Sequence, residues 1–381
     1  MTLLPRSRSR RWRNWVRCLV LGIILSLGLS TMKADDSSIH SVTVGEPVPI
    51  PDNKGDTWVP AWTRSGDLYS PSNDTHGFHE AGSGNVMFNR LLGDRADQLT
   101  GETVNTLSSY GKASVAGPDG CTWKSSGCAA IDGQLYLLVA RHKYGETSGD
   151  GMKRQTAQNA SIIRSADNGK TWVRAAQENY DHPMFPASHF ATPYFINYGQ
   201  DGHEAVADGS DRYVYALSND GFWDNGDTMV LGRVLRSSLS RLNGADWQFW
   251  KQGDGAVDAN WSATAAEATP VIDSPGHLGM TGAVYLPVQK CYFMVGWYYP
   301  AGGGKLPGAC EKTNWDFYVA PHPWGPWKIV DSHTFSPQGY YCPEVCPKFT
   351  PADGSTLWVL AAGNWRNAAA YRLTAIPLSL R

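Results

Sequence analysis

Thr192-Pro193-Tyr194-Phe195-Ile196 recurs along the chain as Thr269-Pro270-Val271-Ile272-Asp273 and as Cys346-Pro347-Lys348-Phe349-Thr350, and the three prolines are 77 residues apart. A related stretch, Val59-Pro60-Ala61-Trp62, lies 133 residues before Pro193, which leaves room for one more unit between them. Residues 124–131 fill that place, with Gly127 at the position of the proline. A fixed period of this length is typical of repeat architectures, so we expect five units.

A polar turn and then an alternating or apolar strand follow each copy of the pattern. We expect these strands at residues 67–70, 134–140, 212–217, 290–297 and 355–360. Long helical periodicity is absent, and 40 Gly and 23 Pro residues provide many turns. The chain therefore favours an all-β fold, a single five-bladed β-propeller of four-stranded antiparallel blades. A β-sandwich or two β domains is the alternative, but neither explains the regular spacing.

The first 34 residues differ in composition from the rest of the chain. They hold seven of the 33 Lys and Arg residues and no Asp or Glu. Basic residues 6–17, an apolar run at 18–30 and Met32-Lys33-Ala34 indicate a secretory signal peptide, and hence a secreted or periplasmic protein. The apolar run is short for a membrane span of about 20 residues, so we expect no stable membrane insertion after cleavage. An uncleaved anchor is the alternative. Residues 35–381 are then the propeller domain.

Without these residues the formal charge changes from -2 to -9, which argues against a nucleic-acid partner. Six cysteines remain, an even number that predicts disulfides in an oxidising compartment. The sequence-local pairing would be Cys121 with Cys128, Cys291 with Cys310 and Cys342 with Cys346. Their spacing does not match a zinc site. We expect a monomer without a cofactor, and a structural ion in the central channel is left open.

In a propeller, the innermost strand of each blade begins at the mouth of a central funnel, where side chains of all blades converge. The residues just before the repeated proline are therefore the first candidates for a site: Asp56, Lys124, His189, Glu267 and Glu344. The ends of the second strands should form the next ring, namely Asp74, Arg141, His142, Asp220, Trp297 and Trp365.

Three acids, Asp56, Glu267 and Glu344, occupy the same position in the repeat. Hydrolysis of a glycosidic bond uses two carboxyl groups, one that donates a proton and one that acts as base or nucleophile. One acid in such a turn is ordinarily a solvated side chain, but three in register favour catalysis. The sequence thus predicts a carboxylate pair in the funnel.

The other candidates would bind or orient a substrate. Lys124, Arg141 and His142 would lower the pKa of a neighbouring carboxyl group or bind a hydroxyl-rich or anionic substrate, and ion pairs at the blade edge are the structural alternative. Sugar rings stack on aromatic faces, so Trp58, Trp297, Tyr341 and Trp365 are candidates for contacts to a carbohydrate. Packing between blades is the alternative reading for the aromatic residues.

Ser165-Ala166-Asp167-Asn168-Gly169-Lys170-Thr171-Trp172 matches the Asp-box pattern S-x-D-x-G-x-T-W. In such a turn the Ser and Asp side chains bond the backbone and Gly permits positive φ. Asp boxes lie at the periphery of a propeller, so the pattern predicts a structural role and indicates little about sialidase activity.

The run Gly55-Asp56-Thr57-Trp58-Val59-Pro60-Ala61-Trp62, with Ser72-Asn73-Asp74 after it, resembles the opening of the domain of unknown function 4185, some members of which hydrolyse D-arabinan. Glu267-Ala268-Thr269-Pro270 is similar to an element of the wider five-bladed superfamily of arabinanases, β-xylosidases and fructosidases. The resemblance implies Asp56 as general base and Glu267 as general acid. Such relatives often add an Asp on the third blade, but residues 189–192 hold no acid, so Asp220 or Glu344 would have to serve.

We therefore expect a secreted glycoside hydrolase that acts on a polysaccharide or oligosaccharide, with an arabinan-like glycan favoured and Glu344 as the reserve acid. A non-catalytic propeller that binds a glycan or a protein is the first alternative. A sialidase or a polysaccharide lyase is the second, since Lys124, Arg141, His142 and Tyr341 could neutralise a uronate and remove its proton.

Overall fold

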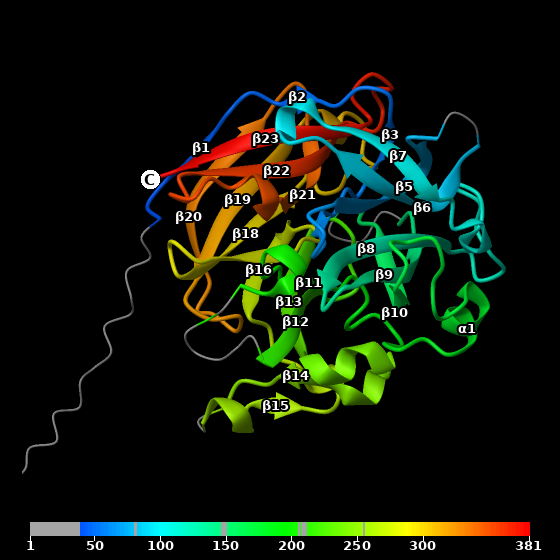
Figure 1. The fold of residues 1–381 in the computed structure, drawn as a ribbon, viewed down its shortest axis with the longest axis vertical. Helices are drawn as coiled ribbons and strands as arrows, with labels where there is room; N and C mark the ends of the chain where they lie inside the picture. Colours follow the sequence, from blue (N-terminus) through cyan, green and yellow to red (C-terminus); the bar gives the residue numbers. More distant parts are fainter. Residues whose placement is uncertain (1–38, 80–81, 146–150, 205, 207–211, 254–255) are drawn as a thin grey trace, which may run out of the picture. The chain divides into compact units, whose positions relative to one another are not determined.

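The computed structural model describes the chain except for residues 1–38, 80–81, 146–150, 205, 207–211 and 254–255. The expected signal peptide, residues 1–34, lies outside the described residues. The described chain forms five antiparallel β-sheets arranged as a five-bladed β-propeller, as the repeats predict (Figure 1). No helix among the described residues is both long enough and apolar enough to cross a membrane.

The first two blades come from residues 54–165. The strands of blade 1 are β3 (Lys54–Asp56), β4 (Ala61–Trp62), β5 (Leu68–Gly77), β6 (Gly84–Leu92) and β7 (Thr100–Asn105). Blade 2 has three strands, one fewer than expected: β8 (Thr122–Ile131), β9 (Gln134–Lys143) and β10 (Thr156–Ser165).

The other three blades complete the ring. The strands of blade 3 are β11 (Tyr194–Phe195), β12 (Tyr213–Asn219), β13 (Gly226–Leu235), β14 (Trp247–Trp250), β15 (Trp261–Ser262) and β16 (Ile272–Leu278). Blade 4 holds β17 (Ala283–Leu286), β18 (Cys291–Tyr298), β19 (Thr313–Ala320) and β20 (Lys328–Phe335). Blade 5 holds β21 (Tyr340–Val345), β22 (Thr356–Gly363), β23 (Leu373–Leu380), β1 (Val42–Val44) and β2 (Val48–Pro49).

Helices are few and short in the described chain. One α-helix, α1 (Ala176–Asp181), follows blade 2. The 3-10 helices are Ala96–Gln98, Ser108–Tyr110, Gln200–Gly202, Arg236–Arg241, Gly244–Asp246, Val257–Ala259, Ala265–Glu267, Ala309–Glu311 and Pro347–Phe349.

The five strands predicted after the repeated pattern are all present, as parts of β5, β9, β12, β18 and β22, the second strand of each blade. Each blade packs between two neighbours, so both faces of a second strand are buried. In β9, residues Leu135 to Ala140 are at most 3% exposed. Burial on both faces explains why these strands read as apolar runs instead of strict alternation.

The structure corrects the predicted position of the fourth repeat. Ile272 and Asp273 belong to β16, which pairs with β13 of blade 3 through Met229 and Ile272. Blade 4 begins instead at β17, where Val284 lies beside Asn197 in a parallel bridge. Residues 251–278 are an excursion of blade 3 whose strands β15 and β16 return to its sheet. The proline pattern recurs in this excursion without marking an innermost strand.

The predicted disulfides are wrong, because the six cysteines among the described residues are all free and buried. Cys121 precedes β8 and Cys128 lies inside it. Seven residues of extended chain span about 20 Å, whereas a disulfide needs Cα atoms within about 7 Å. These two cysteines are close in the sequence, but the extended strand between them holds their Cα atoms too far apart for a disulfide.

The other two pairs are held apart by strands as well. Cys291 is the first residue of β18, and Cys310 follows the opposite end of that strand, in a 3-10 helix before β19. Cys342 lies inside β21, and Cys346 lies just beyond its last residue. Each cysteine is instead a small buried apolar side chain, an ordinary role for a free thiol.

The two ends of the described chain meet in blade 5. Strand β1 pairs with β23 through Val42 and Leu380, and the amides of His40 and Ser41 donate to the carbonyl of Arg381 at 2.6 and 2.9 Å. The N-terminal strand thus completes a sheet that the C-terminal strands begin. This pairing closes the ring of blades.

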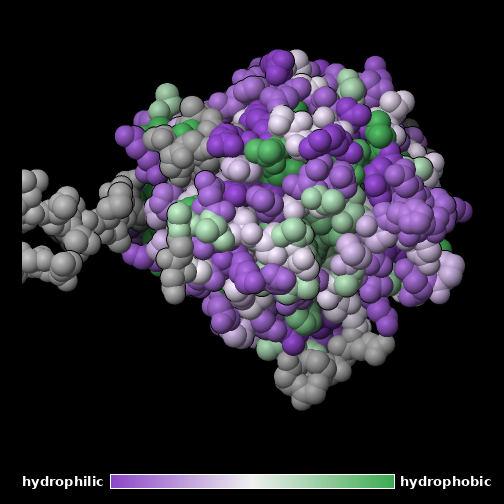
Figure 2. Space-filling view, turned by 90° about the horizontal axis from the view of Figure 1, so that it is seen from below, coloured by the Kyte–Doolittle hydropathy of each residue, from purple (hydrophilic) through white to green (hydrophobic). Residues whose placement is uncertain are grey.

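Exposed apolar residues do not concentrate in one place on the described surface. On the face in Figure 2, hydrophobic residues form small groups among hydrophilic ones. The large exposed apolar side chains come from separate elements: Leu92, Val115, Val173, Tyr180, Leu235, Val257, Val288 and Ile329. Scattered residues of this kind are normal on a protein surface.

Candidate functional site

A polar cavity of about 250 Å³ opens where the five blades converge. Its walls come from every blade and from the loop before blade 2. The residues that line it are Asp56, Asp74, Ser114, Lys124, His142, Tyr144, Gln155, Trp223, Trp297, Tyr299, Lys305, Tyr341, Trp365 and Tyr371. Seven of them are predicted from the sequence: Asp56, Asp74, Lys124, His142, Trp297, Tyr341 and Trp365.

Asp56 is the last residue of β3 and carries the first carboxyl group of the cavity. Its Oδ2 accepts hydrogen bonds from the hydroxyls of Tyr341, at 2.8 Å, and Tyr371, at 3.2 Å. Burial and then the negative charge of Asp74 raise the pKa of Asp56 to about 6, although Lys124 and the hydroxyl donors oppose this shift. A neutral Asp56 is therefore well populated near pH 6.

Asp74 lies next to Asp56 because Asn73 of β5 pairs with Asp56 of β3. The ladder between the two strands is irregular here, and Asp74 adopts φ 53°, in the left-handed region. Bulges of this kind aim a side chain that regular pairing would point elsewhere. Left-handed backbone costs a non-glycine residue about 1–3 kcal/mol and occurs often at functional sites.

The partners of Asp74 keep it ionised. Its Oδ2 pairs with the ammonium of Lys124 and accepts a hydrogen bond from the hydroxyl of Tyr144 at 2.9 Å. Burial alone would raise the pKa of Asp74, but the charge and the hydrogen bond of Lys124 outweigh burial and lower it. The two neighbouring carboxyl groups thus have pKa values shifted in opposite directions, the arrangement expected of an acid and a base.

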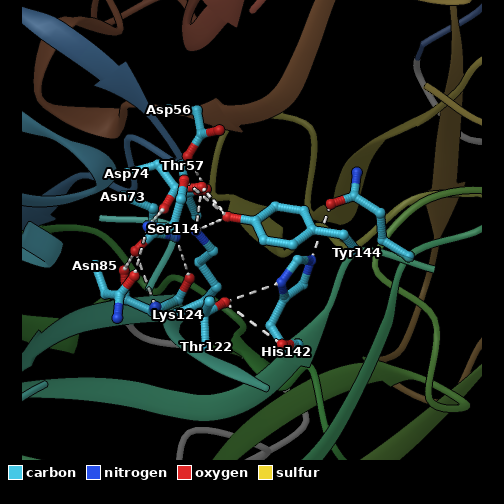
Figure 3. Close-up of polar contacts among 12 residues, drawn as sticks. Asp56, Thr57, Asn73, Asp74, Asn85, Ser114, Thr122, Lys124, His142 and Tyr144 are labelled. Atoms are coloured by element: carbon cyan, nitrogen blue, oxygen red, sulfur yellow. Dashed lines mark hydrogen bonds and ion pairs between the residues drawn. The ribbon is translucent and has the colours of Figure 1, made fainter. Parts of the chain in front are cut away.

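Lys124 of β8 and His142 of β9 line the cavity from blade 2, and Figure 3 shows their polar contacts. The side chain of Lys124 is 4% exposed, and its ammonium contacts Asp74 and the hydroxyl of Tyr144. His142 bonds Gln155 at 2.9 Å and Thr122 at 3.3 Å. Burial, followed by the charge of Lys124, lowers the pKa of His142 to about 3, so the imidazole is neutral and cannot serve as a cation for substrate.

Gly55 allows the strand that carries Asp56 to approach β5 closely. It has φ 130°, and a Cβ atom at this position would lie 2.3 Å from Cγ2 of Thr75. The Thr75 hydroxyl in turn donates to the carbonyl of Lys54. Only glycine fits both the backbone conformation and the space.

Aromatic side chains of blades 4 and 5 form part of the cavity wall. Trp297 and Tyr299 of blade 4 and Tyr341 of blade 5 contact one another, with ring centroids 5.3 to 6.2 Å apart. Trp297 is 1% exposed and donates to the carbonyl of Met280, so it supports the wall more than it offers a face. Trp365 is partly exposed at the cavity.

Glu267, the predicted general acid, does not lie in the cavity. It belongs to the excursion of blade 3, where its exposed carboxylate pairs with Lys251 at 2.9 Å and accepts from Ser262 at 3.1 Å. Hydrogen bonding to Lys251 lowers its pKa. The misplaced fourth repeat explains the error, because Glu267 precedes Pro270 and not an innermost strand.

Glu344 is buried near the centre but is bonded to protein. Its carboxylate accepts from the amide of Gly282 at 2.8 Å and from the hydroxyl of Thr281 at 3.3 Å. Burial raises its pKa to about 8, and it is not among the residues that line the cavity. Its contacts join blades 4 and 5, which indicates a structural role.

Three other predicted residues lie outside the cavity. Arg141 pairs with Asp119 and stacks on Trp123, 4.6 Å from the ring centroid, because adjacent residues on a strand point to opposite faces and His142 takes the inner one. His189 and Asp220 form an ion pair of 2.7 Å in blade 3.

Trp58 and Trp172 serve packing. Trp58 is fully buried and donates to the carbonyl of Gly55 at 2.9 Å. In the turn at 165–172, Asp167 accepts from Thr171, and Trp172 packs on Phe88 of β6, the third strand of blade 1. That position is peripheral, although the relation of this turn to sialidase Asp boxes stays a prediction.

Several residues of the cavity escape the sequence analysis. Tyr144 lies one residue beyond β9, Tyr371 lies just before β23, and Lys305 lies in a glycine-rich loop between β18 and β19. Ser114, Gln155, Trp223 and Tyr299 also come from loops. Of these residues, only Tyr144 could have been predicted from the sequence, because it lies at the same end of β9 as His142. Among the described residues, no three His, Cys, Asp or Glu side chains gather into a metal site.

No family model and no curated protein sequence matches the chain. Solved structures match in fold. A candidate hydrolase from Bacteroides ovatus superposes with a TM-score of 0.53 at 12% identity, over 87% of this chain and 86% of that one. A family-32 β-fructofuranosidase from Bombyx mori gives 0.48 at 12% identity, over 87% and 61%, and a xylan β-1,4-xylosidase from Bacillus halodurans gives 0.46 at 13%, over 86% and 54%. At 12% identity, the match to the candidate hydrolase shows that the two chains share a fold over most of their length, and no more than that.

Proposed function

We propose that the chain hydrolyses a glycosidic bond, with Asp56 as general acid and Asp74 as the ionised carboxylate. The observation that carries the proposal is the opposite pKa shift of two carboxyl groups on neighbouring strands in one cavity. The role of Asp56 differs from that implied by the sequence resemblance, which made it the base. Its raised pKa suits a proton donor instead.

The neighbours of each carboxyl group support these roles. Lys124 and Tyr144 stabilise the charge of Asp74, which would then activate water or attack the anomeric carbon. Asp56 is held by Tyr341 and Tyr371 and has no cation bonded to it among the described residues, so its proton is not displaced by an ion pair. Trp365 would stack on a sugar ring, and the cavity volume suits part of an oligosaccharide.

Three further statements belong to the same proposal. The basic and apolar leader supports export, so we place the activity outside the cytoplasm. The resemblance of residues 55–62 to the opening of domain 4185 makes an arabinan-like glycan the first neutral substrate to test. Because the -9 charge of residues 35–381 disfavours nucleic acid, a carbohydrate is the expected partner of a monomeric chain.

The test compares four proteins on a panel of arabinans, xylans, fructans, sialosides and uronate polymers, by reducing-sugar release and product mass. Wild type should release sugar, and Asp56→Asn and Asp74→Asn should each lower the rate by a factor of about 100 to 10,000, the usual range of acid–base contributions. Glu267→Gln is the matched control and should retain the wild-type rate.

Loss of activity in Glu267→Gln with retention in Asp74→Asn would reverse the assignment. Hydrolysis by none of the proteins, with glycan binding retained, would favour the non-catalytic binding propeller. An unsaturated product that absorbs in the ultraviolet would instead identify a lyase.

A further inference from the structure

Lys305 is a cation of the cavity that the proposed acid–base pair does not use. Its ammonium lies 3.9 Å from the ring centroid of Trp365 and 4.7 Å from that of Tyr144. Both rings line the cavity. Among the described residues, no carboxylate forms an ion pair with Lys305, whereas Lys124 is already paired with Asp74. Lys305 is therefore a positive charge between two aromatic faces, open to the bound molecule.

The loop that carries Lys305 is built to hold this position. Gly304 donates its amide to Oδ2 of Asp224 at 3.0 Å, and Gln155 donates its amide to Oδ1 at 2.6 Å. Asp224 is fully buried, so its carboxylate joins the loops of blades 2 and 4 instead of pairing with Lys305. The amide of Lys153 also donates to the carbonyl of Gly302 at 2.9 Å.

Glycines make this close docking possible. A Cβ atom at Gly303, which has φ 127°, would lie 2.2 Å from the carbonyl oxygen of Lys153. A Cβ atom at Gly304 would lie 2.5 Å from the ring of Tyr299. The loop is thus fixed against two other loops, and the position of Lys305 follows from packing.

A second cation lies at the same rim. Arg366 is exposed, and its guanidinium carbon is 5.0 Å from the ring centroid of Trp365. One of its nitrogens donates to the carbonyl of Lys305 at 3.5 Å. No described carboxylate pairs with Arg366 either. Two cations, Lys305 and Arg366, thus lie close to the ring of Trp365.

Among the side chains that line the cavity, the cations outnumber the anions when Asp56 is protonated, and the buried carboxylate of Asp224 acts on Lys305 from outside the lining. When Asp56 holds the proton that an acid catalyst needs, Asp74 is the remaining negative group and Lys124 and Lys305 are positive, while His142 is neutral. The surrounding chain is acidic overall, so this local excess of positive charge is not a property of the whole surface. An anion beside Lys305 would complete the pairing.

We propose that Lys305 recognises an anionic substituent, a carboxylate or a sulfate ester, on the sugar that stacks on Trp365, so that the substrate is an acidic glycan. This inference rests on the proposed function for its catalytic meaning, but the binding step can be tested without catalysis. Lys305 is a specificity-determining residue in this view, and Arg366 attracts the same substituent at the rim.

The experiment measures binding with the Asp56→Asn variant, which should not turn substrate over. An array of matched acidic and neutral glycans would be used, with uronate oligosaccharides against their carboxyl-reduced forms and sulfated galactan oligosaccharides against their desulfated forms. Calorimetry on the best acidic ligand follows, in the Asp56→Asn background, for Lys305→Met, Lys305→Arg and the exposed control Lys312→Met.

Acidic glycans should bind more tightly than their neutral partners, and Lys305→Met should weaken that binding by about 10- to 100-fold, as for a hydrogen bond to a charged group. Lys305→Arg should restore part of it, and Lys312→Met should have no effect. Comparison with the carboxyl-reduced and the desulfated oligosaccharides shows whether the protein recognises a carboxylate or a sulfate ester.

Equal binding of acidic and neutral partners, no binding of any acidic glycan, or an unchanged affinity in Lys305→Met would each overturn the inference. Wild-type hydrolysis is measured separately. Hydrolysis of neutral glycans alone would support the proposed function and contradict the anionic substrate. Binding of acidic glycans without any hydrolysis would support the anionic ligand and contradict the proposed function.

Discussion

Replacing Asp56 by Asn removes the carboxyl group that burial makes hard to ionise. Its pKa changes from 3.8 to about 6 on folding. A shift of about 2 units corresponds to about 3 kcal/mol of preference for the neutral form. An amide keeps an oxygen that Tyr341 and Tyr371 can bond, and it carries no charge at any pH. The variant should therefore be more stable than wild type at pH 8, by about 1–3 kcal/mol.

The sign of the pH dependence follows from where each state loses its proton. The unfolded chain releases the Asp56 proton near pH 4, and the folded chain holds it until about pH 6. Between these values the folded state binds more protons, so the stability of wild type falls relative to Asp56→Asn as the pH rises. Above about pH 7 the difference is complete and constant. Below pH 4 it vanishes.

Urea unfolding of both proteins at pH 4, 5, 6, 7 and 8 measures this difference directly. Glu267→Gln is the control, since Glu267 is exposed and its pKa is lowered, not raised. A stability difference between wild type and Asp56→Asn that stays flat from pH 4 to pH 8 would refute the assignment of a buried, proton-holding carboxyl group. A wild type that gains stability relative to the variant over this range would refute it as well.

Other predictions test the surroundings of the pair. The wild-type kcat/KM should fall above about pH 6 as Asp56 ionises, and a pH–rate profile would show whether it does. Lys124→Met should destabilise the fold by about 3 kcal/mol because it leaves Asp74 unpaired; in urea unfolding the double variant with Asp74→Asn should regain part of the loss, and an additive double loss would contradict this. Gly55→Ala should cost about 2 kcal/mol or more through its left-handed backbone and the clash with Thr75, and the same substitution at Gly66, which has open space but also a positive φ, is the control that isolates the clash. Alkylation in denaturant without reductant should label all six cysteines of residues 39–381. Cysteines that stay unlabelled until reductant is added would show that disulfides are present after all.

The fold was predictable because the proline pattern repeats in the sequence with a fixed phase. The second strand of each blade lies where the sequence predicts it, because a strand that is buried on both faces is recognisable as an apolar run. The prediction was wrong at Pro270 because a strand that returns to the outer part of blade 3 has the same local sequence pattern as one that begins a blade. Local sequence encodes an extended segment, not the partner it pairs with.

The candidate site was predictable mainly where strands carry it; of its predicted residues, Trp365 lies in a loop, just after β22. Asp56, Lys124 and His142 follow from strand position. Arg141 failed because a one-residue offset reverses the face of a strand. Lys305 reaches the cavity only through the docking of a loop on Asp224, and nothing in its own sequence neighbourhood encodes that distant carboxylate.

The pairing of β1 with β23 has a consequence for how the chain can be reconnected. Since the amide of Ser41 donates to the carbonyl of Arg381, a linker of a few residues between Arg381 and Ile39, in a chain without residues 1–38, would join these two positions without a change in the blades. The ring could then be opened between any two blades. A circularly permuted chain that starts at blade 3 would place blades 1 and 2, which carry Asp56, Asp74 and Lys124, in the middle of the new polypeptide.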